Sequence, residues 1–382
     1  MRWFGFGFNA FQQIQASKNS ENSGLDADKT RLSSPTELRG HVNKDGGYFE
    51  LTQIRASWSR RAFLHLDEPA CVCLEGSVND SCREVLKRSC GCKDVFISES
   101  QITLAFPDRI ECWDLQRNDD TPSWSMDTQS EGSAVSLPLV PGGYIASKSP
   151  FFHSLSPHMQ AKSLALGGDH VILLTAAGAV YTWGQGSHGQ LGHGALLSEE
   201  EPRTVEALWG MKMSSVSAGG WHSVCISDAG DLYVWGWNES GQLGLPSQNL
   251  RKISERKAHQ QGELSQNSST YQEEVFISIQ AFPALLDVTP LCEVKAVGCG
   301  SRHTAAVTTS GDLYTWGWGG YGQLGHQSFS SLDEPQRVEF FRVQQLRVVG
   351  VECGPWNTFA AVTKEEGLAP EHPTKPLNKH GE

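Results

Sequence analysis

The sequence predicts one all-β domain, a single β-propeller in which small antiparallel sheets stand side by side in a closed ring. Three observations predict this fold: a long string that recurs along the chain, regular spacing between most of its copies, and two chain ends that each carry half of the string. Repeats of about 40–50 residues with strand–turn–strand content are typical of propeller blades, because one small sheet cannot cover its own faces and has to stack on neighbours.

The recurring string is clearest at residues 216–245, VSAGGWHSVCISDAGDLYVWGWNESGQLGL, and closely similar strings begin at Leu164 and Val297. Each copy has a Gly pair or a Cys-Gly, a run of small and β-branched residues, a Gly-containing turn, an aromatic run and a Gly-rich tail. This order is typical of a β-hairpin, with turn residues between two strands. In the clearest copy we expect a strand at Ser223–Ile226, a turn at Asp228–Asp231 and a return strand at Leu232–Trp237.

One histidine recurs at the same repeat position, as His170, His222 and His303, and the second step between copies is longer than the first. A catalytic group is needed once in a protein, whereas this histidine is present in each clear copy. We therefore interpret the three imidazoles as structural, each buried and hydrogen-bonded to backbone or to a neighbouring blade.

A tryptophan recurs on the return strand, as Trp183, Trp235 and Trp316. Residues at equivalent positions of a repeat usually form the core between blades, so we interpret these three as structural as well. Trp237 and Trp318 follow two residues later, and the two-residue period of a strand places them on the same face.

The two chain ends complement each other. Residues Phe6–Ile14 (FGFNAFQQI) align with Trp235–Leu243 (WGWNESGQL), which is the second half of a repeat. Residues Val351–Val362 (VECGPWNTFAAV) supply the first half, with Asn357 at the histidine position, one ordinary repeat length after His303. We expect the two ends to pair into one blade, which closes the ring and removes open sheet edges.

Two weaker copies precede the clear ones. Residues Ile54–Phe63 resemble the start of the hairpin, with Trp58 near the position of Trp221, and Cys71–Gly76 resembles a return strand. A second weak copy covers Val95–Leu115. Together with the split copy, six instances are recognisable, and a further unit that has drifted between residues 115 and 163 would make seven blades.

Four segments do not fit the repeat. Residues 16–47 and 118–132 are polar and are expected to be loops or disordered inserts. Residues 249–274 account for the longer step between His222 and His303 and are a candidate surface for a partner. The propeller is expected to span residues 1–366, followed by a Pro-rich and charged tail at 367–382 that is expected to be disordered.

The composition restricts the possible partners. The formal charge is −12, with 31 Lys and Arg against 43 Asp and Glu, whereas direct binding to a nucleic-acid backbone usually needs a basic surface. A local basic patch is possible at Arg55, Arg60 and Arg61. No stretch approaches the roughly 18 consecutive apolar residues that span a bilayer, and the opening MRWFGFGFNAFQQ lacks the features of a secretory signal. We therefore expect an intracellular protein without membrane or direct nucleic-acid contacts.

No motif in the sequence indicates a cofactor, a metal or a catalytic site. Five cysteines lie close together, but their spacing lacks the C-x₂-C pairs of zinc sites, so we expect reduced thiols. The Gly-rich tails lack the GK[ST] of phosphate-binding loops. No G-x-S-x-G, HExxH or two-His-one-carboxylate pattern is present. The five clustered cysteines are Cys71, Cys73, Cys82, Cys90 and Cys92.

The candidate binding residues are those that change between otherwise matching copies. At the start of the hairpin, before the histidine position, the copies carry Asp169, Trp221, Arg302 and Trp356. Positions that vary within a regular ring are where its surface can become specific for one partner. We therefore predict that Trp221, Arg302 and Trp356 contact a partner protein.

The strings AGGWHS, CGSRHT, LYTWGWGGYGQLGH and VWGWNESGQLG resemble the regulator of chromosome condensation repeat, most specifically over Leu164–Val362. The resemblance implies a seven-bladed propeller closed by pairing of the chain ends. Within the family, the FGFGF start, GWNESGQL, CGPWNT and AFPALLD (residues 281–287) are most similar to a small member with little besides this domain. That similarity implies a nuclear, chromosome-associated, non-enzymatic adaptor. Its partner would be a Jumonji-C oxygenase that demethylates histone lysines, and it would support histone methylation control and chromosome stability in mitosis.

The founding member of the family implies a different function, as a guanine-nucleotide exchange factor for a small nuclear GTPase that docks on nucleosomes through basic loops and a basic N-terminal tail. The acidic charge of this chain, and a first predicted strand with no basic tail before it, favour the adaptor over both activities. Nucleotide exchange is kept as the alternative function, and direct chromatin binding as a third.

Overall fold

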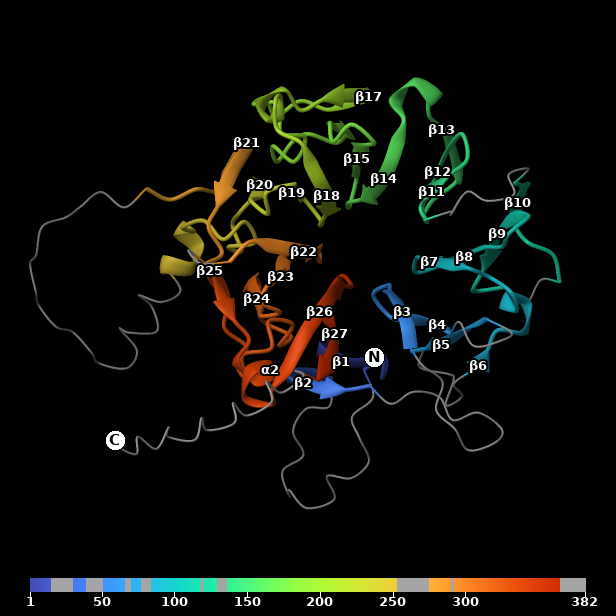
Figure 1. The fold of residues 1–382 in the computed structure, drawn as a ribbon, viewed down its shortest axis with the longest axis horizontal. Helices are drawn as coiled ribbons and strands as arrows, with labels where there is room; N and C mark the ends of the chain where they lie inside the picture. Colours follow the sequence, from blue (N-terminus) through green and yellow to red (C-terminus); the bar gives the residue numbers. More distant parts are fainter. Residues whose placement is uncertain are drawn as a thin grey trace, which may run out of the picture.

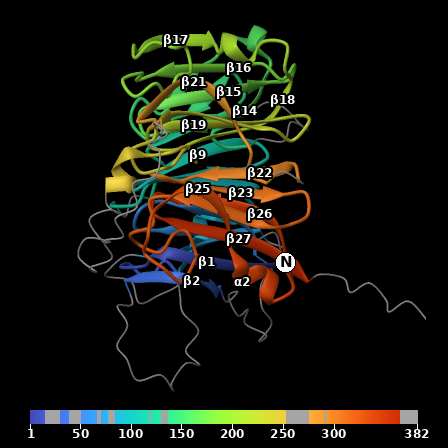
Figure 2. The ribbon, with the colours of Figure 1, turned by 90° about the vertical axis from the view of Figure 1, so that its left-hand side faces the viewer.

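The chain forms a ring of seven antiparallel sheets, each standing as one blade around a common centre (Figure 1). Figure 2 shows the same ring from its side. The predicted all-β propeller is confirmed, and the number of blades is seven. This computed structural model describes residues 1–14, 30–38, 51–65, 70–76, 84–117, 120–128, 136–252, 275–289 and 292–364.

Blades are numbered here in chain order, and their strands are given from the centre of the ring outward. Blade 1 contains β3 (Leu51–Ala56), β4 (Arg61–His65), β5 (Cys71–Glu75) and β6 (Glu84–Val85). Blade 2 contains β7 (Asp94–Ile97), β8 (Gln101–Ala105), β9 (Arg109–Asp114) and β10 (Trp124–Asp127). Blade 3 contains β11 (Leu139–Val140), β12 (Gly143–Ile145) and β13 (Phe152–Ser154).

The remaining blades follow the same order. Blade 4 contains β14 (Ala161–Leu166), β15 (His170–Thr175), β16 (Val180–Gly184) and β17 (Glu199–Thr204). Blade 5 contains β18 (Met213–Ala218), β19 (His222–Ser227), β20 (Leu232–Trp237) and β21 (Ile279–Leu286). Blade 6 contains β22 (Val294–Cys299), β23 (His303–Thr308), β24 (Leu313–Gly317) and β25 (Leu332–Arg337). Blade 7 contains β26 (Leu346–Cys353), β27 (Asn357–Lys364), β1 (Arg2–Phe8) and β2 (Arg31–Glu37).

Short helices lie between some of these strands. In the described part of the chain they include the 3-10 helices η1 (Lys87–Ser89), η2 (Pro157–Met159) and η3 (Glu206–Leu208), and the α-helix α2 (Glu339–Val343). Residues 248–252 are also helical. No helix in the described part of the chain has the length and apolar character needed to cross a bilayer.

Blade 7 joins the two ends of the chain. Strand β1 pairs antiparallel with β27, with Phe6 opposite Thr358 and Trp3 opposite Ala361. The N–H of Phe8 donates to the carbonyl of Trp356 at 2.9 Å. The predicted closure of the ring by its first and last strands is therefore confirmed (Figure 1).

Blade 3 is the seventh repeat, which the sequence allows between residues 115 and 163 but does not make recognisable. Its three described strands have two or three residues each. It keeps a Gly pair, Gly142-Gly143, at the junction of its first two strands, but it lacks the histidine and the Gly-rich tail of the repeat. Its core side chains Val140 and Ile145 pack on Ala105 and Ile110 of blade 2, so the blade is held by ordinary apolar packing that has no distinctive sequence pattern.

The hydrophobic core lies between neighbouring blades. Every residue of β15, β19 and β23 is buried, because these strands have a blade on each face. Ile172 of blade 4 packs with Trp235 of blade 5, and Val224 of blade 5 packs with Trp316 of blade 6. Burying one such side chain stabilises a protein by about 1.5–3 kcal/mol, so each boundary contributes to the stability of the whole ring.

Two outer strands correct the expectation of loops. Strand β2 (Arg31–Glu37) lies inside the expected insert 16–47, and β10 (Trp124–Asp127) lies inside 118–132. An outermost strand has one free edge in water and takes polar residues and proline without loss of pairing. The sequence RLSSPTE is therefore as polar as a loop although it forms a strand. The other residues of these two segments, most of 249–274 and the tail 367–382 lie largely or wholly outside the described residues.

Candidate functional site

The turns between the first and second strands of blades 4 to 7 lie side by side on one face of the ring. The N–H of Gly168 donates to the carbonyl of Gly219 at 3.1 Å, and the N–H of Gly220 donates to Ser301 O at 3.2 Å. The N–H of Ser301 donates to Pro355 O at 2.9 Å. These bonds fix the positions of the residues that vary between copies, including Trp221, Arg302 and Trp356.

The Gly-rich tail after each third strand crosses over the neighbouring turn. Gly236 has a φ of +110°, and a Cβ at this position would lie 2.5 Å from the carbonyl oxygen of Trp221. Only glycine is accommodated there. This crossing interrupts the alternation of β20 and brings Trp237 next to Trp221, whereas Trp235 stays in the core.

Blade 5 carries the first group of surface rings. Trp221 and Trp237 lie edge to face with centroids 5.5 Å apart. His188, from the tail of blade 4, lies 5.8 Å from Trp221 and 5.5 Å from Trp237. The guanidinium of Arg302 in blade 6 lies over Trp237, 4.7 Å from the ring centroid, which is a favourable cation–π geometry.

Blades 6 and 7 carry the second group. Trp318 lies 4.8 Å from Tyr321 and 5.0 Å from Trp356, and Tyr321 lies 5.8 Å from Trp356, all edge to face. Phe8 lies 4.8 Å from Tyr321 and 6.5 Å from Trp58 of blade 1. The two groups are continuous because the N–H of Trp318 donates to Arg302 O at 2.8 Å.

These side chains form one strip across one face of the ring, from the tail of blade 4 to blade 1. Most of them are partly exposed, and Trp58 is 53% exposed. The ring centroids are so close that the rings contact one another and leave no cage for a cation between them. The strip therefore suits flat contact with a protein surface. We name it the aromatic band, and its members are Phe8, Trp58, His188, Trp221, Trp237, Arg302, Trp318, Tyr321 and Trp356.

The recurring histidines are buried between blades. His170 Nε2 lies 2.8 Å from Ser223 Oγ, His222 Nε2 lies 3.0 Å from Thr304 Oγ1, and His303 Nε2 lies 3.0 Å from Thr358 Oγ1. In each pair the histidine belongs to one blade and the hydroxyl to the next. The structure thus places all three imidazoles in links between blades, away from the aromatic band.

The same hydroxyl groups determine which ring nitrogen of these histidines carries the hydrogen. Ser223 Oγ donates to Gln190 O at 2.8 Å, and Thr304 Oγ1 donates to Gln242 O at 2.7 Å. Since each hydroxyl hydrogen is used in this way, the hydroxyl oxygen accepts from the imidazole Nε2–H. Burial lowers the pKa of His170 to about 4. Burial also lowers the pKa of His222 and of His303 to about 3, so all three are neutral at physiological pH.

The recurring tryptophans lie at the same boundaries. The indole N–H of Trp235 donates to Gln190 O at 2.8 Å, and that of Trp316 donates to Gln242 O at 3.0 Å. Trp183 faces blade 3, which has no Gly-rich tail, and its indole N–H lies 3.4 Å from the hydroxyl of Tyr144. All three rings are less than a tenth exposed.

The structure brings Trp221, Arg302 and Trp356 into the aromatic band, with Trp237 and Trp318 completing it. Sequence reasoning placed the last two on the core face, and it did not identify Phe8, His188 or Tyr321. A signal for Phe8, Trp237 and Trp318 was present, because an aromatic residue directly follows the last glycine of the third strand in blades 5, 6 and 7. Trp58 falls one residue before the structural equivalent of Trp221, since Ser57 N donates to Arg60 O as Gly219 N does to His222 O.

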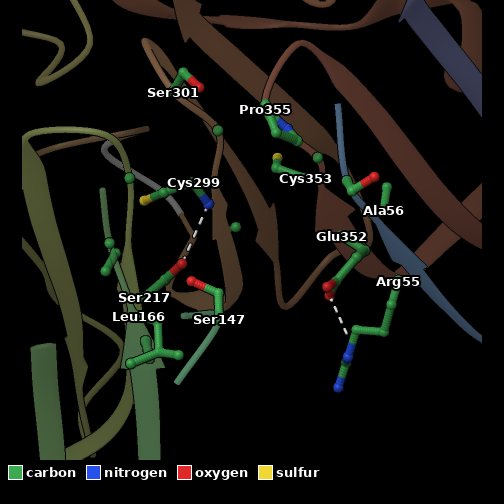
Figure 3. Close-up of a pocket in the computed structure, with 18 of the residues that line it drawn as sticks. Arg55, Ala56, Ser147, Leu166, Ser217, Cys299, Ser301, Glu352, Cys353 and Pro355 are labelled. Atoms are coloured by element: carbon green, nitrogen blue, oxygen red, sulfur yellow. Dashed lines mark hydrogen bonds and ion pairs between the residues drawn. The ribbon is translucent and has the colours of Figure 1, made fainter. Parts of the chain in front are cut away.

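The centre of the ring holds a cavity of about 580 Å³ lined by the innermost strands of the blades. Arg55 of β3 and Glu352 of β26 form an ion pair across part of it at 3.1 Å (Figure 3). Burial raises the pKa of Glu352, and the nearby Arg55 opposes that shift. Ser217 Oγ accepts a hydrogen bond from the N–H of Cys299 at 3.2 Å. These contacts hold neighbouring blades together.

The local basic patch that the sequence allows at Arg55, Arg60 and Arg61 is not formed. Arg55 pairs with Glu352 in the central cavity, and Arg61 is buried in an ion pair with Glu75. Arg60 donates to the backbone carbonyl of Glu99 at 3.0 Å. The three arginines are therefore directed to three different places.

The clustered cysteines form no metal site among the described residues. Cys71, Cys73 and Cys92 are buried, and Cys90 is exposed. Burial raises the pKa of Cys92 to about 12, so its thiol is not a reactive thiolate. No group of three or more His, Cys, Asp or Glu side chains in the described part of the chain is placed to hold a metal ion. Cys82 lies outside the described residues.

Comparison with known proteins identifies the family. The family described as "Regulator of chromosome condensation (RCC1) repeat" matches residues 177–226, 229–307 and 310–361, and a second description of the same repeat matches 161–190, 213–242 and 294–323. The chain is 41% identical over 386 residues to the RCC1 domain-containing protein 1 of Homo sapiens, across 94% of this chain and 96% of that protein. This chain belongs to the RCC1 repeat family.

Other members of the RCC1 family support the same assignment. The RCC1 domain-containing protein 1 of Mus musculus is 42% identical over 390 residues, across 94% of this chain and 96% of that protein. The crystal structure of Prp20p from Saccharomyces cerevisiae covers 97% of this chain and 92% of its own, with a TM-score of 0.67 and 16% identity. At that identity the likeness concerns the fold, which is the RCC1-type propeller. That structure is described together with the binding properties of Prp20p to Gsp1p and histones.

Proposed function

We propose that this RCC1-family propeller is a non-enzymatic adaptor that binds its partner protein through the aromatic band. The partner is a Jumonji-C oxygenase that demethylates histone lysines, and the adaptor acts in the nucleus at chromosomes, in histone methylation control and mitotic chromosome stability. The continuity of the aromatic band across several blades supports binding of a protein, because a long strip of partly exposed rings matches the extended contact area of a protein interface.

The chemistry of the band suits tight protein contact. Tryptophan, tyrosine and arginine are the residues that carry most binding energy at protein interfaces. Here the rings hold one another in edge-to-face contact at 4.8–5.8 Å, so little side-chain freedom is lost on binding. Arg302 is paired with no carboxylate among the described residues, and its charge is available to an acidic group of the partner.

The partner's identity rests on family resemblance. The 41% identity to the human RCC1 domain-containing protein 1 extends over nearly the whole of both chains, which supports a shared function. The net charge of −12 is consistent with chromatin association through a partner, since an acidic surface repels the phosphate backbone of DNA.

The test is recovery of the partner by a band variant. The chain carrying Trp221→Ala, Arg302→Ala and Trp356→Ala is purified from nuclei with its bound proteins, which are identified by mass spectrometry. We expect the amount of Jumonji-C oxygenase recovered with the variant to fall by at least about tenfold, which is the loss of affinity expected when one hot-spot residue is removed from an interface. Phe329→Ala, an exposed ring outside the band, is the control and is expected to retain it. A folded triple variant that recovers the oxygenase at the wild-type level would contradict the proposal.

The alternative function is nucleotide exchange on a small GTPase. The observation that favours it is the fold shared with Prp20p, which is described as binding Gsp1p. Release of labelled GDP from a loaded small nuclear GTPase is measured with substoichiometric amounts of this chain. We expect GDP to be released at its spontaneous rate. Catalytic release would contradict the adaptor proposal and would make this chain an exchange factor. Direct chromatin binding, the third candidate, would appear as nucleosome binding that weakens steeply with salt.

A further inference from the structure

The outermost strand of blade 5 differs from the equivalent strands of blades 4, 6 and 7. All four strands carry a proline in the same register. The residue after each proline pairs with the third-strand residue that lies two positions before the glycine of positive φ. These pairs are Thr36 with Gly5, Arg203 with Thr182, Ala284 with Val234 and Gln336 with Thr315. The four prolines are Pro35, Pro202, Pro283 and Pro335. This shared register allows the side chains of the four strands to be compared position by position.

Three positions distinguish blade 5. The residues four before, one before and two after the proline are polar in blades 4, 6 and 7. In blade 5 they are Ile279, Phe282 and Leu285, which are 37%, 54% and 55% exposed. The polar equivalents are Ser198, Glu201 and Thr204 in blade 4, Ser331, Glu334 and Arg337 in blade 6, and Arg31, Ser34 and Glu37 in blade 7.

Neighbouring apolar side chains of blade 4 extend this surface. The N–H of Gly194 donates to Ala281 O at 3.0 Å, and a Cβ on Gly194 would meet the ring of Phe282. Leu197, three residues further on, is 70% exposed, and Trp209, next to the helix η3 that contacts β21, is 67% exposed. Exposed apolar side chains gathered in this way mark interaction sites. We name the group Leu196, Leu197, Trp209, Ile279, Phe282 and Leu285 the rim patch.

The charge around the rim patch is acidic. Arg203 is already paired with Glu199 at 2.5 Å, and Lys212 with Asp228 at 2.9 Å. The exposed carboxylates near the patch make no ion pair among the described residues, so their charge is left for a partner. These carboxylates are Glu200, Glu201, Glu206 and Asp287.

The backbone edge of β21 is unsuited to adding a further strand. Ala281 O is already used by Gly194, and Pro283 has no N–H to donate. Docking therefore has to use side chains. The distance from Ile279 to Leu285 along an extended strand is about 20 Å, which is the length of roughly 13 residues of α-helix.

We propose that the rim patch docks an amphipathic helix of a partner protein, with an apolar face and flanking Lys or Arg residues. A second copy of this chain fits less well, because a two-fold contact would bring the same carboxylates together. The chain's own segment 253–274, ISERKAHQQGELSQNSSTYQEE, has too few apolar residues to cover the patch. Ile279, at one end of the rim patch, pairs with Trp237 of the aromatic band across the sheet, and Phe282 and Leu285 lie further along β21, away from Trp237. The proposal for the rim patch stands whether or not the band binds an oxygenase.

The test replaces the three apolar residues by their polar equivalents. Ile279→Ser, Phe282→Glu and Leu285→Arg together give blade 5 residues that blade 6 already carries in the same register, so the variant is expected to fold. The probe is a fluorescent helical peptide of Leu and Lys, long enough to span β21, with one apolar face. Its controls are a scrambled peptide of the same composition and a Leu and Glu peptide with the same apolar face.

We expect the Leu and Lys helix to bind the full chain, and the triple variant to weaken binding by on the order of tenfold or more. The scrambled and the Leu and Glu peptides are expected to bind poorly, and Trp221→Ala to have no effect. Equal binding by the triple variant, or by the scrambled peptide, would overturn the proposal. So would self-association of the wild-type chain that the triple variant abolishes in sedimentation, or helix binding that appears only after residues 253–274 are deleted.

Discussion

Blades 4 to 7 are joined by one repeated device, whereas blades 1 to 3 use a different side chain at each boundary. In the first set a histidine of one blade binds a Ser or Thr hydroxyl of the next, and that hydroxyl binds a backbone carbonyl of the preceding tail. We name this arrangement of histidine, hydroxyl and backbone carbonyl the inter-blade relay. It consists of neutral groups and is repeated at three boundaries.

The divergent half relies on charged groups. Glu99 of blade 2 accepts hydrogen bonds from Ser57 Oγ at 3.0 Å and from Ser59 N at 3.2 Å in blade 1. Asp94 Oδ2 of blade 2 accepts from Leu137 N, just before blade 3, at 2.7 Å. Arg61 of blade 1 occupies the position of the relay hydroxyl, with its guanidinium 5.6 Å from the ring of Phe359 in blade 7. The comparison shows that one ring geometry can be kept by unrelated contacts.

Acid is expected to have the largest effect on the repeated half. The folded-state pKa of His170, His222 and His303 lies at about 3–4, below the value near 6.5 of an unfolded histidine. The unfolded chain therefore binds more protons below about pH 6.5, and stability falls as pH falls from there towards 4. At pH 5 the loss is about 2 kcal/mol for each histidine, or about 6 kcal/mol in total. Denaturant titrations between pH 7 and pH 5 measure it.

The control for that experiment is His222→Asn, which copies the Asn357 of blade 7. Its stability is expected to depend less on pH than that of the wild type, by about 2 kcal/mol over the same range. An unchanged pH dependence in this variant would show that the buried histidines are not the cause.

In the divergent half, Glu75→Gln is expected to lower the free energy of unfolding by about 3–5 kcal/mol, because removing one partner of a buried ion pair leaves an uncompensated charge. The carboxylate and Arg61 are both nearly inaccessible, at 3% and 1% side-chain exposure. Urea denaturation at pH 7 measures the loss. The double variant Arg61→Met with Glu75→Leu removes both charges and is expected to recover most of the stability. If it is no more stable than Glu75→Gln, the buried charge is not the cause.

A single relay member is expected to matter less. His222→Ala removes the donor to Thr304 and leaves a cavity between blades 5 and 6, for a loss of about 2–3 kcal/mol in the free energy of unfolding. His222→Asn keeps a polar side chain and is expected to lower the free energy of unfolding by less than His222→Ala does. Thermal and urea unfolding at pH 7 compare the two. If the alanine variant loses no more than an ordinary surface substitution, which is about 0.5 kcal/mol, the relay does not stabilise the boundary.

The smallest effect on stability is expected in the aromatic band. Trp356→Ala removes a partly exposed ring that contacts Trp318 and Tyr321, for a loss of about 1 kcal/mol or less in unfolding, while affinity for the partner falls about tenfold or more. Calorimetric titration and thermal unfolding of the same sample separate the two. A large loss of stability without loss of affinity would make Trp356 a structural residue.

The repeat made much of the ring predictable. The Gly turns and aromatic strands recur because the inter-blade relay requires them, so the hairpins of blades 4 to 6 and the closure by β1 and β27 could be predicted. Strands β2 and β10 could not, because an edge strand in water accepts the same polar residues as a loop. The ion pair of Arg61 and Glu75 depends on the register of β4 with β5, which spacing alone does not fix.

The candidate site was predictable in part. Trp221, Arg302 and Trp356 stood out because they vary between matching copies. Trp237 and Trp318 did not stand out, because the alternation of side chains along a strand predicts that they face the core. The positive φ of Gly236 and Gly317 breaks this alternation and directs them to the surface. Phe8 was missed because its neighbours Tyr321 and Trp58 come from other blades, and only the closed ring brings them together.

Hydrogen exchange of the proposed complex with a Jumonji-C oxygenase tests the central claim most directly, because it maps the contact surface without any substitution. Backbone amides are compared in the free and bound chain by mass spectrometry. We expect slower exchange in the turns and tails that carry the aromatic band, around His188, Trp221, Trp237, Arg302 and Trp356. Protection confined to the opposite face of the ring, or to blades 2 and 3, would contradict it.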